Sequence, residues 1–208
     1  MVVLFFSGVA GFFMVLALLL QSGLGFTPLQ SGLTTIPFPV GVLLISLVNN
    51  RLGNRFLRQR VAAGTMLLVC AMLWLRMVIP DVNSFADHWT IAPALFLGGL
   101  GLGGTISSLF QSVLANVPPR DAGSGSGALQ SFQQMGAAFG VAIVGQIFFS
   151  MLEATGADAG DKAAYIEAMR IAIFYEFAAF GSVALLVFFL RSPGQQAQGS
   201  APTHAAAD

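Results

Sequence analysis

Two ionisable side chains, Arg76 and Glu176, interrupt long apolar stretches of this sequence. A charge inside a membrane-spanning helix is costly, so each residue is a candidate for function. Arg76 precedes Pro80 by four residues, or ~6 Å of helix, and Glu176 follows Met169 by seven, or ~10 Å. Because these depths nearly match, we hypothesise a structural ion pair. Two alternatives stay open: proton coupling through Glu176, and extension of both side chains to the outer membrane interface.

Uncharged polar side chains form a second group of candidates. Ser108 and Gln111 are three residues apart, and Gln130 and Gln134 are four apart, so each pair shares one face of a helix. Neutral amides and hydroxyls among Phe and Met suit weakly polar or cationic organic substrates. We therefore predict that these four residues line a substrate pathway, with hydrogen bonding between helices as the alternative.

The sequence offers little for a catalytic or metal site. Cys70 is the only cysteine, and His88 and His204 lie apart from any cluster of possible metal ligands. No Ser-His-Asp arrangement is visible. The stretch GSGSG at 123–127 lacks the following Lys-Ser/Thr and the preceding strand of a phosphate-binding loop. We predict no enzyme, no metal and no other cofactor.

The candidate residues must be positioned by membrane-spanning helices. Of the 208 residues, 56% are hydrophobic and only 9% are charged, against about 25% charged in soluble domains. The net charge of zero gives no indication of a nucleic acid partner. A span needs ~20 apolar residues, and six stretches qualify: Val2–Leu20, Gly32–Val48, Val61–Ile79, Thr90–Ala115, Gly127–Leu152 and Met169–Leu190. The first lacks the basic start of a signal peptide and is predicted to be a true span.

Arginine is concentrated at one set of predicted loops. Short loops rich in Arg and Lys stay on the cytoplasmic side. One side would hold six positive residues, Arg51, Arg55, Arg58, Arg60, Arg120 and Arg191, against Lys162 and Arg170 on the other. This asymmetry predicts a multi-pass protein of the plasma (cytoplasmic) membrane with both termini in the cytoplasm. We expect residues 193–208, which are rich in Pro, Gly and Ala, to form a disordered cytoplasmic tail.

Four segments carry a resemblance to a known family. SLVNNRLGNR (46–55) resembles the loop signature of the major facilitator superfamily, with Asn50, Arg51, Gly53 and Arg55 in or next to the expected places, although Asn50 replaces an Asp. Residues 18–44 resemble the first helix pair of the C-terminal half in fourteen-helix drug:proton antiporters. Residues 98–104 and 121–145 look like the fourth and fifth helices of that half. The resemblance covers residues 1 to about 192.

The resemblance implies a fold, an activity and a set of partners. The fold would be an all-α polytopic half of a major facilitator, in which residues 1–192 form two three-helix inverted repeats. The third and sixth helices of such a half are neighbours, which would bring Arg76 and Glu176 together. The first, second, fourth and fifth line the cavity, as the pathway prediction requires. The implied activity is proton-coupled export of small organic molecules or drugs across the lipid bilayer.

Half a cavity cannot perform alternating access alone. We therefore expect an N-terminal six- or eight-helix half in the same or another chain, or a homodimer. The rival class is a self-contained six-helix channel or a non-transporting membrane scaffold.

Glycines are concentrated in the fourth and fifth predicted spans, notably Gly98, Gly101, Gly104, Gly136 and Gly140. Small residues let helix backbones approach closely in lipid, and they also permit bending. The two interpretations, static packing and a hinge, are both kept as predictions. Gly136 and Gly140 form a GxxxG pair, for which packing inside the bundle is favoured over dimerisation.

Overall fold

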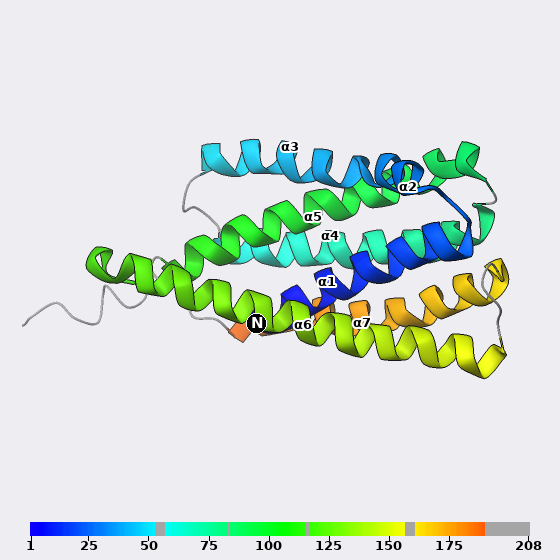
Figure 1. Ribbon diagram of the computed structural model, residues 1–208. Helices are drawn as coiled ribbons and strands as arrows, with labels where there is room; N and C mark the ends of the chain where they lie inside the picture. Colours follow the sequence, from blue (N-terminus) through cyan, green and yellow to red (C-terminus); the bar gives the residue numbers. More distant parts are fainter. Residues whose placement is uncertain (53–56, 83, 115–116, 157–160, 190–208) are drawn as a thin grey trace, which may run out of the picture.

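The computed structural model of the protein describes residues 1–52, 57–82, 84–114, 117–156 and 161–189. Within these ranges it is all-helical, and six helical segments are long and apolar enough to cross a membrane (Figure 1). The predicted all-α fold with six spans is confirmed. The predicted tail, residues 193–208, lies outside the described residues.

The spans are built from seven α-helices and four short helical turns in the described ranges. In order these are α1 (Val2–Leu18), the π-helical turn η1 (Leu19–Gly23), α2 (Pro28–Thr35), α3 (Pro37–Leu52), α4 (Leu57–Val78), η2 (Ile79–Asp81), η3 (Phe85–Asp87), α5 (His88–Leu114), η4 (Pro119–Asp121), α6 (Ala122–Thr155) and α7 (Lys162–Phe189).

The second span begins with a strong local signal. The Thr27 side chain accepts a hydrogen bond from the backbone N–H of Gln30, and the Gln30 side chain accepts one from the N–H of Thr27. Pro28 occupies the first helical position, where its missing N–H costs nothing. A second proline, Pro37, divides the span into α2 and α3, because a proline inside a helix cannot donate to the preceding turn.

The last span differs from the sequence prediction. We expected it to begin at Met169, but α7 begins at Lys162, with the Asp161 carboxylate accepting from the N–H of Ala164 at 3.3 Å. The polar residues of this extra turn hide the boundary from a hydropathy pattern. Glu176 therefore lies fourteen residues into its helix, or ~21 Å, instead of the ~10 Å expected.

The helices form two interlocked groups of three (Figure 1). In one group α5 packs against both α3 and α4, and in the other α1 packs against both α6 and α7, while α4 and α7 join the groups. Exchanging the first three spans with the last three converts one group into the other. This is the arrangement expected of two inverted repeats.

Glycine lets the helices of each group touch through their backbones. A Cβ at Gly140 or Gly136 of α6 would overlap a backbone carbonyl oxygen of α1, that of Ser7 or Val3. A Cβ at Gly101 of α5 would lie 2.6 Å from the carbonyl oxygen of Gly64 in α4. At these positions no side chain can be accommodated. The packing interpretation is therefore supported here, and hinge motion stays a prediction.

Of the other glycines of the fourth span, Gly99 and Gly103 are also tightly packed, and a Cβ at Gly103 would lie only 2.5 Å from Ile45. Gly98 and Gly104 are less constrained. A Cβ at Gly98 would lie 3.1 Å from the Phe38 ring, and one at Gly104 would be in ordinary contact, at 3.6 Å from Ile45 and 3.9 Å from Gly64. The glycine-rich run therefore mixes positions that demand glycine with positions that tolerate alanine.

We predict that Gly140→Ala destabilises the protein by about 1–3 kcal/mol, since the new methyl group must push α1 away from α6. The matched control is Gly127→Ala on the same helix, where a Cβ would meet nothing within 4 Å. That change should be neutral or stabilise by up to about 1 kcal/mol through helix propensity. Thermal unfolding of the purified protein in detergent measures both; equal stabilities would contradict the α1–α6 contact.

Candidate functional site

Glu176 is the most unusual side chain of the described structure. Its side chain is 1% exposed, and neither carboxylate oxygen has a hydrogen-bond partner among the described residues. Oε2 lies against Gly8 of α1, where a Cβ would be only 2.9 Å away, and the ring of Phe180 closes the same space. The carboxyl is thus held between α1 and α7, in a space that the absence of a Gly8 side chain creates.

The structure does not form the predicted ion pair between Arg76 and Glu176. The Arg76 guanidinium donates to the backbone carbonyl of Arg170 and lies 4.4 Å from the centre of the Phe174 ring. Glu176 is two residues past Phe174, or roughly 200° around an α-helix. The third and sixth spans are neighbours as expected, but Arg76 meets one face of α7 while Glu176 occupies the face toward α1.

A hydroxyl pair lies beside the Glu176 site. Tyr175 donates from its hydroxyl group to Oγ of Ser7 at 2.9 Å, and Ser7 donates to the carbonyl of Leu4 at 2.8 Å. Ser7 is 2% exposed. Tyr175 and Ser7 directly precede Glu176 and Gly8 in the sequence, so the same turns of α7 and α1 carry both the hydroxyl pair and the carboxyl.

The four predicted pathway residues do not share one surface. Gln130 and Gln134 are exposed on the N-terminal half of α6, and Gln111 is half-buried on α5. Ser108 is fully buried, and its Oγ has no partner in the described structure. Ser108 follows Gly101 by seven residues, two helical turns, so it lies on the face of α5 that packs against α4. Only the two glutamines of α6 form an open amide surface, and their role stays a prediction.

The cytoplasmic loop motif is only partly visible. Asn50 and Arg51 lie in the last turn of α3, and Arg51 is exposed, while Gly53 and Arg55 lie outside the described residues. The neighbouring Asn49 makes the contact that the motif did not reveal. Its side chain is 3% exposed and donates to Oγ of Ser107 on α5 at 2.6 Å. An asparagine at the end of an apolar run was the available signal.

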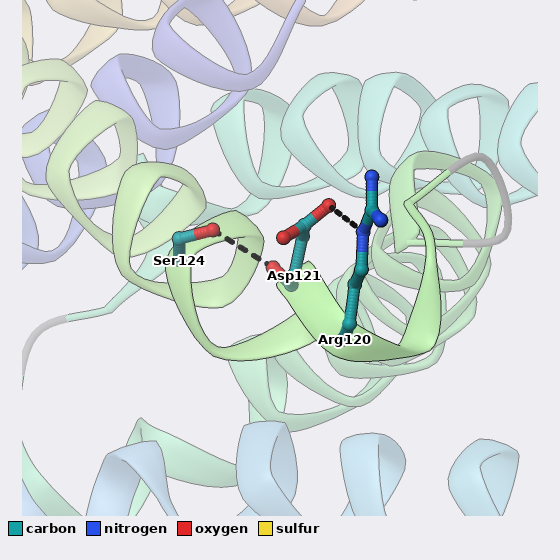
Figure 2. A network of polar contacts seen from close by, with 3 residues as sticks. All are labelled: Arg120, Asp121 and Ser124. Carbon is teal, nitrogen blue, oxygen red and sulfur yellow. Dashed lines mark hydrogen bonds and ion pairs between the residues drawn. The ribbon is translucent and has the colours of Figure 1, made fainter.

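A second polar turn stands at the start of α6 (Figure 2). Arg120 donates from Nε to the Asp121 carboxylate at 3.3 Å, and Ser124 donates to the Asp121 backbone carbonyl at 2.9 Å. Both charged side chains are largely exposed, so this ion pair contributes little to stability. The contacts define the turn by which the chain enters the fifth span.

An apolar pocket of about 620 Å³, which the sequence analysis did not predict, lies between the second span and the start of the fourth. The Phe85 and His88 rings stack with centroids 4.5 Å apart at one side of it. Its size is in the range of small-molecule sites. The pocket is lined by Leu33, Ile36, Pro37, Val40, Phe85, His88, Trp89, Ala92, Pro93 and Phe96.

These features define a class of protein: an all-α polytopic membrane protein built from two interlocked three-helix groups. A sequence profile described as the Major Facilitator Superfamily matches residues 1–206. The chain belongs to this superfamily.

Named relatives come from bacteria. The chain is 37% identical over 149 residues to a probable actinorhodin transporter of Streptomyces coelicolor, covering 71% of this chain and 26% of the relative. It is 31% identical over 160 residues to a puromycin resistance protein of Streptomyces alboniger (76% and 31%). It is 31% identical over 156 residues to a multidrug resistance protein of Mycobacterium tuberculosis (72% and 27%). The match spans under a third of each relative's length.

We predict that cysteines at the α6 glutamines react with a water-soluble maleimide in the assembled protein. On a Cys70→Ser background, Gln130→Cys and Gln134→Cys should label, because buried amides facing lipid would be costly. Ser108→Cys should stay protected until denaturation. Phe139→Cys, an exposed apolar position on the same helix, controls for burial against lipid. Glutamine positions as protected as Ser108→Cys would contradict an aqueous pathway there.

Proposed function

We propose that this chain is the C-terminal half of a proton-driven exporter of small organic molecules. The observation that carries the proposal is the match of the superfamily profile to residues 1–206. The names of the relatives, a probable actinorhodin transporter and proteins of puromycin and multidrug resistance, support an organic cargo. The exposed amides of α6 supply polar groups without charge, which suits weakly polar or cationic molecules.

Alternating access requires a second half. Transporters of this fold move two six-helix bundles against each other around a site near the bilayer midplane. We propose that an N-terminal half of six or eight helices, on the same or another polypeptide, covers the open amide surface of α6. A homodimer is the third arrangement, which places two copies of α6 across one cavity.

We propose a plasma membrane location with both termini in the cytoplasm. Arg51, Arg58 and Arg120 lie at the ends of α3, α4 and η4 that would face the cytoplasm. The opposite ends carry acidic residues, including Asp81, Glu153 and Asp161. Retention of short arginine-rich loops on the inner side supports this orientation.

We expect vesicles that contain this chain together with an N-terminal half to accumulate amphipathic cationic dyes when a pH gradient is imposed. A protonophore should abolish accumulation, because the gradient is the only energy source. Vesicles that contain the chain alone are the control, and they should show no uptake where a separate N-terminal half is required. Dye uptake followed by fluorescence measures this; dependence on ATP would contradict the proposal, and uptake by the chain alone would show that the homodimer is the working arrangement.

The orientation predicts which loop cysteines a membrane-impermeant reagent reaches in whole cells. On the Cys70→Ser background, Asp161→Cys in the outer turn before α7 should label without lysis. Ser124→Cys, in the turn of Figure 2, should label only after the membrane is opened. The reverse pattern would place both termini outside the cytoplasm.

A further inference from the structure

The buried carboxyl of Glu176 is the one acidic group of the described structure whose two oxygens are both sealed from solvent without a partner. It is enclosed by α1 and α7 of this chain, so a second half cannot reach it while these helices stay packed. A buried carboxylate needs a cation or hydrogen-bond donors. Protonation removes the charge, which is the larger part of that cost, so the neutral acid is the form that fits the packed arrangement.

The surroundings of Glu176 offer no substitute for a proton. α1 and η1 contain no ionisable side chain, and α6 contributes only Glu153, exposed near its outer end. On α7 itself, Arg170 pairs with Glu167 at 2.8 Å, and the hydroxyl of Tyr175 donates to Ser7. The remaining ionisable groups of α7 are Lys162 and Tyr165, which belong to its outer turns.

The side chains of α4 are directed elsewhere. Arg76 lies on Phe174 and the carbonyl of Arg170, and Cys70 is exposed. Arg58 and Arg60 belong to the inner end of α4, where Val61 packs with Val187. That point is eleven residues past Glu176, or ~16 Å along α7.

We propose that Glu176 is a proton-binding site whose occupancy controls the packing of α1 on α7, apart from the amide surface of α6. In the packed state the carboxyl binds one proton and is neutral. When the proton leaves, a charge remains between Gly8 and Phe180, and α1 must move away from α7 to admit water or a cation.

The glycine contacts give this movement a route to the amide surface. α1 is fixed to α6 where Gly136 and Gly140 meet the backbone of Val3 and Ser7, so α1 and α6 move as one unit. Gln130 and Gln134 lie on that unit. Deprotonation of Glu176 would therefore displace the glutamines without any contact between proton and substrate. This coupling rests on the proposed proton-driven transport, whereas proton binding itself does not.

Infrared difference spectra recorded while the assembled protein is titrated with acid and base test proton binding directly. We expect a C=O band of a neutral carboxyl that disappears in Glu176→Gln and persists in Glu167→Gln, the same change at an exposed carboxylate of the same helix. A band unaffected by Glu176→Gln would overturn the site. Loss of thermal stability in Glu176→Gln would also overturn it. The amide is similar in shape to the neutral acid, so the substitution should destabilise the protein only if the packed structure requires a charged carboxylate.

Transport assays in proteoliposomes test the coupling. Glu176→Gln should lose accumulation driven by a pH gradient, to the level of vesicles treated with protonophore, and should keep exchange of substrate between equal pools. Glu176→Asp should restore part of the driven accumulation, and Glu167→Gln should retain all of it. Driven accumulation by Glu176→Gln at the wild-type level would overturn the coupling. A wild-type protein without any driven accumulation, but with the Glu176 infrared band, would contradict the proposed function and leave the proton site standing.

Discussion

Close backbone contact at glycine is the interaction on which the rest of this structure depends. In lipid the hydrophobic effect does not drive helices together, because the surrounding tails are as apolar as leucine. Van der Waals contact must hold the helices together instead. This contact is more extensive where glycine lets two backbones approach closely. The carbonyl groups of α1 reach α6 at Gly136 and Gly140, and α5 reaches α4 at Gly101. These contacts hold α1 against α6 and α5 against α4, whereas α1 packs less extensively on α7, where the proposed movement would take place.

The proposed proton site and the proposed amide surface lie on different faces of the α1–α6 pair. The amides of Gln130 and Gln134 lie on the exposed face of α6, while Glu176 of α7 packs against the buried face of α1. Rigid attachment of α1 to α6 makes the two surfaces parts of one body. In the proposed mechanism, a change of charge at Glu176 displaces α1 and α6 together and so moves Gln130 and Gln134. No chain of polar residues between the two places is needed.

Sequence reasoning predicted the properties that depend on length and composition. The six spans and the all-α class are readable because each apolar run matches the thickness of a bilayer. The depth of Glu176 along its helix is not readable, because polar residues hide the start of α7 at Lys162. The direction in which a side chain points is set by tertiary packing, and that is where the ion-pair hypothesis is wrong for this structure. The sequence pattern puts Ser108 and Gln111 on one face of a helix, yet Ser108 is fully buried where α5 packs against α4, and Gln111 is only half-buried. The Asn49–Ser107 contact joins residues 58 positions apart, and the apolar pocket joins α2, α3, η3 and α5. Neither therefore leaves a local pattern in the sequence.

The apolar pocket lies beside a glycine contact that is made through backbone atoms: a Cβ at Gly41 would overlap the backbone carbonyl oxygen of Phe96, a residue of the pocket lining. Val40 and Trp89 are exposed, and α2 and α3 touch the rest of the protein mainly through α5. Because the contact between Gly41 and Phe96 uses the backbone, substitutions among the pocket side chains can reshape the pocket while the glycine contact is kept. Over evolutionary time, such independence lets a single bundle acquire new apolar binding preferences at little cost in folding, while the glycine positions stay fixed by the backbones that they touch.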